Sequence, residues 1–210
     1  HLKADYQFKA GQYINIKAQI NGEEIRRSYS ISSSPKSEEL RVVVKAVEGG
    51  VFSKYATEQL KVDDILDVAA PEGKFVLENK DAKVIVGIAA GSGITPIISL
   101  AKDVLESAND RTFILVYGNK TVEDTIYYNE IESLRNKYLG RFFVHYTFTK
   151  VNIEGTLFGR IERSTINYVL KNKHADKSVD AYFLCGPEDM IKKVTAVLTE
   201  NGANEDQINY

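Results

Sequence analysis

The chain has 210 residues, and its 27 Lys and Arg nearly balance 29 Asp and Glu, which leaves a formal net charge of -2 at pH 7. This balance gives no electrostatic reason to expect nucleic acid or an anionic membrane as a partner, and no apolar run is long enough to span a bilayer. A single cysteine excludes an internal disulfide and a cysteine-ligated iron-sulfur cluster within this chain, and three scattered histidines offer zinc no ligand set. We therefore expect no metal here and a reducing, cytoplasmic setting.

Residues 1–79 contain short runs that are typical of an antiparallel sheet. Residues 13–20 alternate between apolar and polar side chains, and Asn21-Gly22 directly after them is a strong hairpin turn. Further strands are predicted at 26–32, 40–47, 65–69 and 74–77, with a brief helix at 52–60. These make about five strands, and they end at the polar residues 78–83, where we place the boundary between a domain of 1–79 and one of 80–210.

Residues 80–210 change character, because apolar strands now alternate with amphipathic helices. Strands are predicted at 84–88, 113–117, 142–148, 181–184 and 207–210, and helices from Pro96, Val122, Glu162 and Pro187. A Thr121/Asp124 capping pair stands before the second of these helices. This order predicts a doubly wound parallel sheet, which binds ligands beyond the carboxyl ends of its strands.

The strand at 84–88 runs into a turn of small residues, in which Gly91, Ser92 and Gly93 let the backbone turn tightly and approach a bound group. Thr95 is the predicted N-cap of the next helix, and Pro96 suits its first turn. Such a helix directs free N–H groups and the positive end of its dipole at the turn, so we expect a phosphate there. The alternative is a tight turn with no ligand, since Pro96 stands where a dinucleotide fingerprint has its third glycine.

In the first domain, Arg27-Ser28-Tyr29-Ser30 combines groups that suit a flat, phosphorylated cofactor. An arginine can hold a pyrophosphate, a tyrosine ring can stack on a heterocycle, and a serine hydroxyl can bond a ring nitrogen. A second turn, Gly49-Gly50-Val51-Phe52-Ser53, opens the short helix and is another candidate anion site. The alternative is an edge strand with a surface arginine and a half-buried tyrosine.

Several segments together resemble the ferredoxin-NADP reductase superfamily, and within it the reductase subunits of bacterial phenylacetate-type oxygenases. They are RSYS at 27–30, GGVFS at 49–53, PEGKF at 71–75, GSGITP at 91–96, YGNK at 117–120 and CGPEDM at 185–190. Each is weak alone, but in this order and spacing they are highly specific, and the resemblance covers essentially the whole chain. It implies an antiparallel Greek-key β-barrel, N-terminally incomplete, followed by an α/β nucleotide domain, with FAD bound between them.

The resemblance also implies roles for individual residues. Arg27 would grip the FAD pyrophosphate, Tyr29 would stack on the isoalloxazine and Ser30 would lie near its N5 atom. Further contacts to FAD phosphate would come from Gly50, Val51 and Ser53. The nicotinamide nucleotide would be held by Gly91, Ser92, Gly93, Thr95 and Pro96, and by the corner Cys185, Gly186 and Pro187.

Cys185 permits two interpretations, because a lone thiol after an apolar strand is usually a small buried residue, whereas a following helix N-terminus can lower its pKa. We interpret it as a small contact near the nicotinamide and assign no general acid or base, since hydride transfer needs alignment more than a protein base. His145 lies inside a predicted strand and is interpreted as structural.

The end of the second parallel strand predicts a preference for NADPH over NADH, which are the two possible electron donors. Asn119, Lys120 and Thr121 at the end of that strand offer an amide, a cation and a hydroxyl to a ribose 2′-phosphate. The resemblance adds Thr149 and Lys150 after the third strand, where NADPH-using relatives often have a serine and a basic residue. The alternative is that both lysines are simply solvated at loop tips.

The expected function is an FAD-dependent NAD(P)H reductase that passes electrons to an acceptor outside this chain, with an iron-sulfur domain or protein, fused downstream, as the expected acceptor. Two alternatives are the reductase portion of a flavohaemoglobin and a non-catalytic nucleotide-binding regulatory module. The strand that would complete the barrel is expected upstream of His1.

Overall fold

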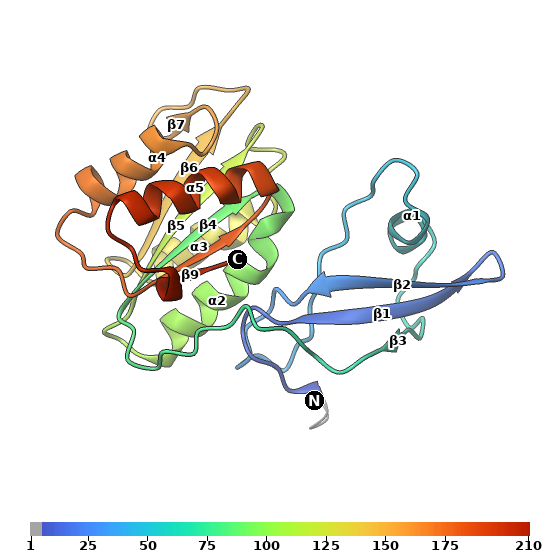
Figure 1. Cartoon of the computed structure of the whole chain (residues 1–210). Helices are drawn as coiled ribbons and strands as arrows, with labels where there is room; N and C mark the ends of the chain where they lie inside the picture. Colours follow the sequence, from blue (N-terminus) through green and yellow to red (C-terminus); the bar gives the residue numbers. More distant parts are fainter. Residues whose placement is uncertain (1–5) are drawn as a thin grey trace.

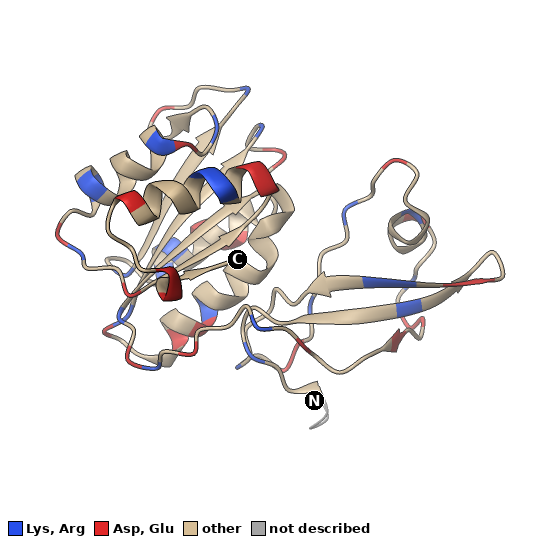
Figure 2. Cartoon of the chain, in the orientation of Figure 1, with Lys and Arg blue, Asp and Glu red and all other residues tan. Residues whose placement is uncertain are grey.

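The computed structural model describes residues 6–210, and the first five residues of the predicted N-terminal domain lie outside the described residues. The chain forms two parts, an antiparallel sheet with one helix and a parallel sheet with helices on both faces (Figure 1). Lysine and arginine alternate with aspartate and glutamate over both parts, without one sign dominating either (Figure 2). Within residues 6–210, no helix is both long enough and apolar enough to cross a membrane.

The N-terminal sheet has three strands in the order β2-β1-β3, with β1 at Tyr13–Ile20, β2 at Glu23–Ser30 and β3 at Asp67–Val68. The predicted hairpin is confirmed: β1 and β2 pair antiparallel over their full lengths, and Asn21 and Gly22 both have positive φ, 53° and 82°, as a type I′ turn requires. The alternation of β1 buries one face against helix α1, at Val51–Glu58.

The strands predicted at 40–47 and 74–77 do not form, so the expectation of about five strands is wrong, and the described residues make an open three-stranded sheet. Val42 forms only an isolated bridge with Ile31. Leu40, Val42 and Val44 do pack against the core of this part, so the alternating pattern correctly indicated burial on one face. A strand also needs a neighbouring backbone to pair with, and alternation alone does not supply one.

The C-terminal sheet has six parallel strands in the order β7-β6-β5-β4-β8-β9, which confirms the doubly wound prediction. The strands are β4 at Val84–Ala90, β5 at Thr112–Asn119, β6 at Phe142–Phe148, β7 at Leu157–Phe158, β8 at Ala181–Cys185 and β9 at Ile208–Asn209. The two-residue β7 was not predicted.

Helices cover both faces of this sheet (Figure 1). One face carries α2 at Ile94–Ser107 and α3 at Tyr128–Lys137, and the other carries α4 at Arg163–Asn167 and α5 at Glu188–Glu200. Short turns of other helix types complete the chain: η2 at Gly91–Gly93, η3 at Tyr168–Lys173 and η4 at Glu205–Gln207.

The helix predicted from Val122 begins instead at Tyr128. Thr121 and Asp124 do bond to each other, since the Asp124 N–H lies 3.3 Å from the Thr121 hydroxyl, but this pair closes an isolated turn. Tyr127 then adopts a left-handed conformation with φ 64°, which prevents a continuous helix across residues 122–128.

The strand order reverses beside β4, because β5 lies on one side of it and β8 on the other. A doubly wound sheet has its ligand crevice at such a reversal, beyond the carboxyl ends of the strands. In this chain those ends continue into Gly91–Gly93 after β4 and into the corner Cys185-Gly186-Pro187 after β8. The topology therefore brings the two predicted nucleotide segments together.

Candidate cofactor site

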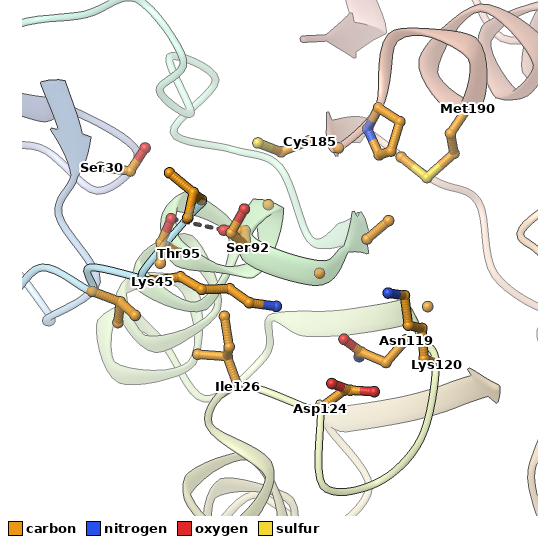
Figure 3. A pocket seen from close by; sticks show the side chains of 18 of the residues that line it. Ser30, Lys45, Ser92, Thr95, Asn119, Lys120, Asp124, Ile126, Cys185 and Met190 are labelled. Carbon is orange, nitrogen blue, oxygen red and sulfur yellow. Dashed lines mark hydrogen bonds between the residues drawn. The ribbon is translucent and has the colours of Figure 1, made fainter. Parts of the chain in front are cut away.

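A cavity of about 930 Å³ opens where the two parts meet, and both parts line it. Figure 3 shows Ser30 from the N-terminal part on one side, with Ser92, Cys185 and Asn119 from three strand ends of the parallel sheet around it. The predicted residues that line the cavity are Arg27, Tyr29, Ser30, Gly50, Val51, Ser53, Gly91, Ser92, Gly93, Thr95, Asn119, Lys120, Thr149, Cys185, Gly186 and Pro187. Pro96 and Lys150 do not line it.

The end of β2 presents Arg27 and Tyr29 to the cavity. Arg27 is exposed, and its Nη1 donates only to the neighbouring Arg26 carbonyl, at 2.7 Å, among the hydrogen bonds of residues 6–210. The Tyr29 ring packs 5.6 Å from the ring of Phe52 in α1, and burial raises the pKa of its hydroxyl. A free guanidinium therefore lies beside a neutral aromatic ring, which suits an anion attached to a flat heterocycle.

The N-terminus of α1 forms the second wall of this part. A Cβ on Gly50 would lie 2.3 Å from the Ser53 hydroxyl and 2.5 Å from a Val47 methyl group, so a larger residue would require these two side chains to move. The first turn of α1 contains no acidic residue, so its free N–H groups keep their attraction for an anion. The Ser53 hydroxyl itself donates to the Gly50 carbonyl, at 3.3 Å, and accepts from the Val47 N–H, at 3.2 Å. The backbone of this turn, more than the Ser53 hydroxyl, is thus available to a phosphate.

The glycine turn after β4 is shaped by close contacts on one side and open space on the other. A Cβ on Gly93 would lie 2.1 Å from the Cys185 carbonyl oxygen, whereas a Cβ on Gly91 would meet nothing within 4 Å. Gly91 also has a positive φ of 54°, and the buried Tyr117 hydroxyl donates to its carbonyl at 2.9 Å. Tyr117, the first residue of the YGNK segment, therefore holds the shape of this turn.

Helix α2 begins directly after the turn, with Gly93 as its N-cap and no acidic residue in its first turn. The prediction that Thr95 is the N-cap is wrong: Thr95 lies inside the helix, and its hydroxyl donates to the Ser92 carbonyl at 3.0 Å (Figure 3). Gly93 takes that position because its backbone can pass within contact distance of the β8 corner.

The corner at Cys185 and the start of α5 differ from the start of α2 in their charged groups. Burial raises the pKa of the Cys185 thiol, which keeps this group neutral. The first turn of α5 contains Glu188 and Asp189, which oppose an anion at that helix end. Of the helix ends beside the cavity, those of α1 and α2 carry no acidic residue and suit phosphate better than that of α5, whose two acids pair with Lys192 and Lys193.

The ends of β5 and β6 lie together at the far side of the cavity. The Thr149 N–H donates to the Asn119 carbonyl at 3.1 Å, and the Lys150 N–H donates to the Lys120 carbonyl at 3.0 Å. Asn119 is 9% exposed, and its Nδ2 has no hydrogen-bond partner within residues 6–210. A buried amide donor without a partner normally implies an acceptor that is supplied by a ligand or a water.

Arg160 lines the cavity where Lys150 was expected to contribute. It follows β7, the two-residue strand whose carboxyl end joins this edge of the sheet. Arg160 was not predicted, because so short a strand has no periodicity to detect. Lys45 and Lys193 also line the cavity without having been predicted, because Lys45 belongs to the outward face of an alternating run and Lys193 to the polar face of helix α5.

The fold also joins two histidines that are scattered in the sequence. The His145 and His174 Nε2 atoms lie 2.8 Å apart, on β6 and directly after η3, away from the cavity lining. Burial first, and then the neighbouring His174, lower the pKa of His145 to about 4. No group of three or more metal-binding side chains gathers within residues 6–210.

These features fit a dinucleotide cofactor. The cavity volume lies within the ~300 to 1,000 Å³ range of small-molecule sites. Gly91 opens into free space, the starts of α1 and α2 carry no acid, and the Asn119 amide lacks a partner within the described residues. Arg27 and Tyr29 supply a cation and an aromatic ring from the N-terminal part of the same lining. An FAD bound at β2 and α1 would face a nucleotide at the start of α2.

Comparison with known proteins gives an independent test. Residues 1–77 match the oxidoreductase FAD-binding domain family, and residues 88–196 match the oxidoreductase NAD-binding domain family. Over 99% of its length the chain is 32% identical to a subunit of the 1,2-phenylacetyl-CoA epoxidase of Escherichia coli, and over 97% it is 31% identical to the flavohemoprotein of Bacillus subtilis. It covers 59% and 51% of those two proteins, so it spans little more than half the length of these relatives.

A solved structure shows the same arrangement of elements. A ferredoxin NADP+ reductase from Neisseria gonorrhoeae with bound FAD and NADP superposes with a TM-score of 0.79, at 24% identity, and the match covers 99% of this chain and 87% of that one. At this identity the superposition supports the fold.

Proposed function

Since the chain belongs to the ferredoxin-NADP reductase superfamily of FAD- and NAD(P)-binding oxidoreductases, we propose that its cavity holds FAD against β2 and α1 and a nicotinamide nucleotide against the start of α2. The observation that carries the proposal is that the glycine turn at the strand-order reversal faces Arg27, Tyr29 and Ser30 across one cavity. Two sites on opposite walls of one space allow two flat rings to meet.

Each wall has a separate task. Arg27 would bind the pyrophosphate of FAD, with the N–H group of Val51 as a further donor, while Tyr29 and Ser30 would orient its ring system. The Gly50 N–H is not free for this, because it donates to the Val47 carbonyl at 3.0 Å. The turn from Gly91 to Gly93, with Thr95, orients the nucleotide, and the neutral Cys185 provides a small, uncharged contact beside the reacting carbon. Bound FAD would supply the redox chemistry, namely the acceptance of a hydride from NAD(P)H and the release of electrons to an acceptor.

The test is direct. Purified protein is expected to show flavin absorbance, or to gain it when FAD is added, and NADPH or NADH is expected to bleach that absorbance under anaerobic conditions. A folded, colourless protein that takes up no FAD would contradict the proposal and would favour a regulatory module that keeps the fold without turnover.

For the electron donor we propose NADPH. Lys120, Thr149 and Arg160 line one end of the cavity, and the unpartnered Asn119 amide lies beside them. Because Lys150 does not line the cavity, the pair of cations that suits a 2′-phosphate is Lys120 with Arg160, in place of the predicted Lys120 with Lys150.

For the acceptor we propose an iron-sulfur domain or protein, carried by a longer version of this chain or by a partner. The similarity to one subunit of an epoxidase fits an acceptor on another domain or protein, and the iron-sulfur cluster is our proposal for that acceptor. The similarity to a flavohemoprotein supports a haem acceptor as the second candidate. The full-length gene product distinguishes the two. We also propose a cytoplasmic location and a boundary between the two domains at residues 79 and 80.

A further inference from the structure

We propose that Lys102 is a positioning residue, which from α2 holds the backbone directly after β2 and so fixes the two parts at the separation that hydride transfer needs. This inference rests on the proposed function, because it assumes FAD at β2 and a nucleotide at the start of α2. Lys102 lies outside the cavity lining, so it acts through the backbone and not on a bound ligand.

Lys102 is a buried cation at the contact between the two parts. It is 6% exposed, its Nζ donates to the Ser32 carbonyl at 2.9 Å, and it forms an ion pair with Glu130 Oε1 at 2.6 Å. Nζ also lies 5.6 Å from the centre of the Tyr127 ring. Desolvating an ammonium group is unfavourable unless every partner is in place, so these three contacts fix the position of Nζ closely.

The residues after β2 are bound one after another by the same surface. The Ser99 hydroxyl of α2 donates to the Ser33 carbonyl at 2.7 Å, and the Ser32 and Tyr127 hydroxyls lie 2.6 Å apart. The Ser34 hydroxyl bonds Glu106 of α2. Ser32, Ser33 and Ser34 are at most 5% exposed. Their residue types are typical of a surface turn, whereas the structure places them in a polar contact between the two parts.

Helix α2 connects this contact to the nucleotide turn. It begins directly after Gly91–Gly93, and Ser99 and Lys102 lie further along the same rigid helix. On the other side, Ser32 follows Tyr29 and Ser30 with only Ile31 between. A displacement of Ser32 relative to α2 therefore displaces the proposed flavin residues relative to the proposed nucleotide residues. Hydride transfer is highly sensitive to such displacements, since reacting atoms must lie about 3 to 3.5 Å apart.

The first measurement uses the protein as purified, with its flavin content matched between wild type and variants. Lys102→Met keeps the length of the side chain and removes Nζ, and Glu130→Gln weakens the same contact more gently. Amide hydrogen exchange in residues 31–34 is expected to rise about tenfold or more in Lys102→Met, with β4 and β5 unchanged. Lys192→Met is the matched control. It removes an exposed lysine of α5, which pairs with Glu188 of α5 and belongs to a different helix from Lys102. Unchanged exchange in residues 31–34 would overturn the proposal.

The second measurement uses protein loaded with FAD. Lys102→Met is expected to reduce its flavin roughly 10- to 100-fold more slowly in a single turnover at saturating NADPH, while its Kd for FAD stays within about threefold of wild type. Faster exchange with an unchanged reduction rate would also overturn the proposal, because the contact would then be structural only. If Lys102→Met does not fold, Glu130→Gln and Ser99→Ala decide by the same criteria. Failure of the wild type to take up FAD would refute the proposed function, and the exchange measurement would still test the contact.

Discussion

The two sheets of this protein differ in how far their own apolar residues stabilise them. The parallel sheet has six strands and two apolar clusters, one under α2 and α3 and one under α4 and α5. The N-terminal sheet has three strands, and its buried cluster is Ile14, Ile16, Ala18, Ile20, Ile31 and Phe52. Its remaining order comes from the contacts of residues 32–34 with α2 and, in our proposal, from FAD. The comparison teaches that the parallel sheet is stabilised by its own apolar clusters, whereas the N-terminal sheet also depends on contacts with α2 and on the proposed cofactor.

The largest expected effect is on the smaller core. Phe52→Ala is expected to destabilise the N-terminal part by about 3 to 5 kcal/mol, because Phe52 is 2% exposed and is the largest side chain of its cluster. Hydrogen exchange is expected to rise in β1 and β2 but not in β4 and β5. Phe113→Ala is the matched variant in the parallel sheet, where Phe113 is 0% exposed, and it is expected to weaken both parts. Equal effects of Phe52→Ala on all four strands would show that the parts unfold together.

The next largest effect is expected on the affinity of the N-terminal part for FAD. Arg27→Ala is expected to weaken FAD binding by about 1.5 to 3 kcal/mol, since it removes a charge-assisted bond to the pyrophosphate. This loss corresponds to roughly 10- to 150-fold in Kd. Arg26→Ala is the control, because Arg26 is exposed, pairs with Glu24 at 2.7 Å and does not line the cavity. A fluorescence titration that gives the same Kd for Arg27→Ala and wild type would remove Arg27 from the site.

Acid is expected to weaken the larger part selectively. In the folded chain the pKa of His145 lies at about 4, against an ordinary value of 6.5, so the unfolded chain takes up this proton first. The free energy of unfolding should therefore fall as the pH falls from 6.5 towards 4, by about 1 to 3 kcal/mol in total. Urea unfolding at several pH values measures this slope. His145→Gln should flatten the slope, and an unchanged slope in that variant would assign it to other groups.

The smallest expected effect concerns nucleotide choice. Lys120→Ala is expected to lower kcat/KM for NADPH a few-fold and to leave NADH unaffected, because an exposed charge pair contributes only about 0.2 to 1 kcal/mol. Lys150→Ala should change neither value, since Lys150 does not line the cavity. Steady-state kinetics with both nucleotides decide. If Lys150→Ala lowers kcat/KM for NADPH more than Lys120→Ala does, the 2′-phosphate contacts Lys120 and Lys150, as the sequence predicts, and not Lys120 and Arg160.

Sequence periodicity predicted those features that depend on a residue's own neighbours in the chain. The apolar runs of β4 and β5, the hairpin at Asn21-Gly22 and the helix start at Pro187 all follow from local burial and turn chemistry, and the structure confirms them. The small residues at Gly91 and Gly93 correctly indicated a close approach of two backbone segments. At Gly93 no side chain fits, because a Cβ would meet the backbone of Cys185.

Features that depend on distant contacts could not be predicted. The run at 40–47 has strand periodicity but lacks a partner beyond the bridge at Val42. The Thr121/Asp124 pair is a real turn, yet the left-handed Tyr127 delays the helix. The burial of Ser33 depends on α2, which lies far along the chain. His145 and His174 meet only because η3 packs over β6.

The reversal of strand order also determines when the site can form. Strand β8 completes one wall of the crevice by pairing with β4, in a register that joins Ile85 to Ala181, whereas the other neighbour of β4 pairs Ile85 with Phe113. Closing the longer loop is slow, because contacts of high sequence separation carry a larger entropic barrier. During synthesis, β4, β5 and β6 emerge well before β8. The crevice between Gly93 and Cys185 is therefore among the last features to be built, and a nascent chain acquires its nucleotide site only when its C-terminal strands arrive.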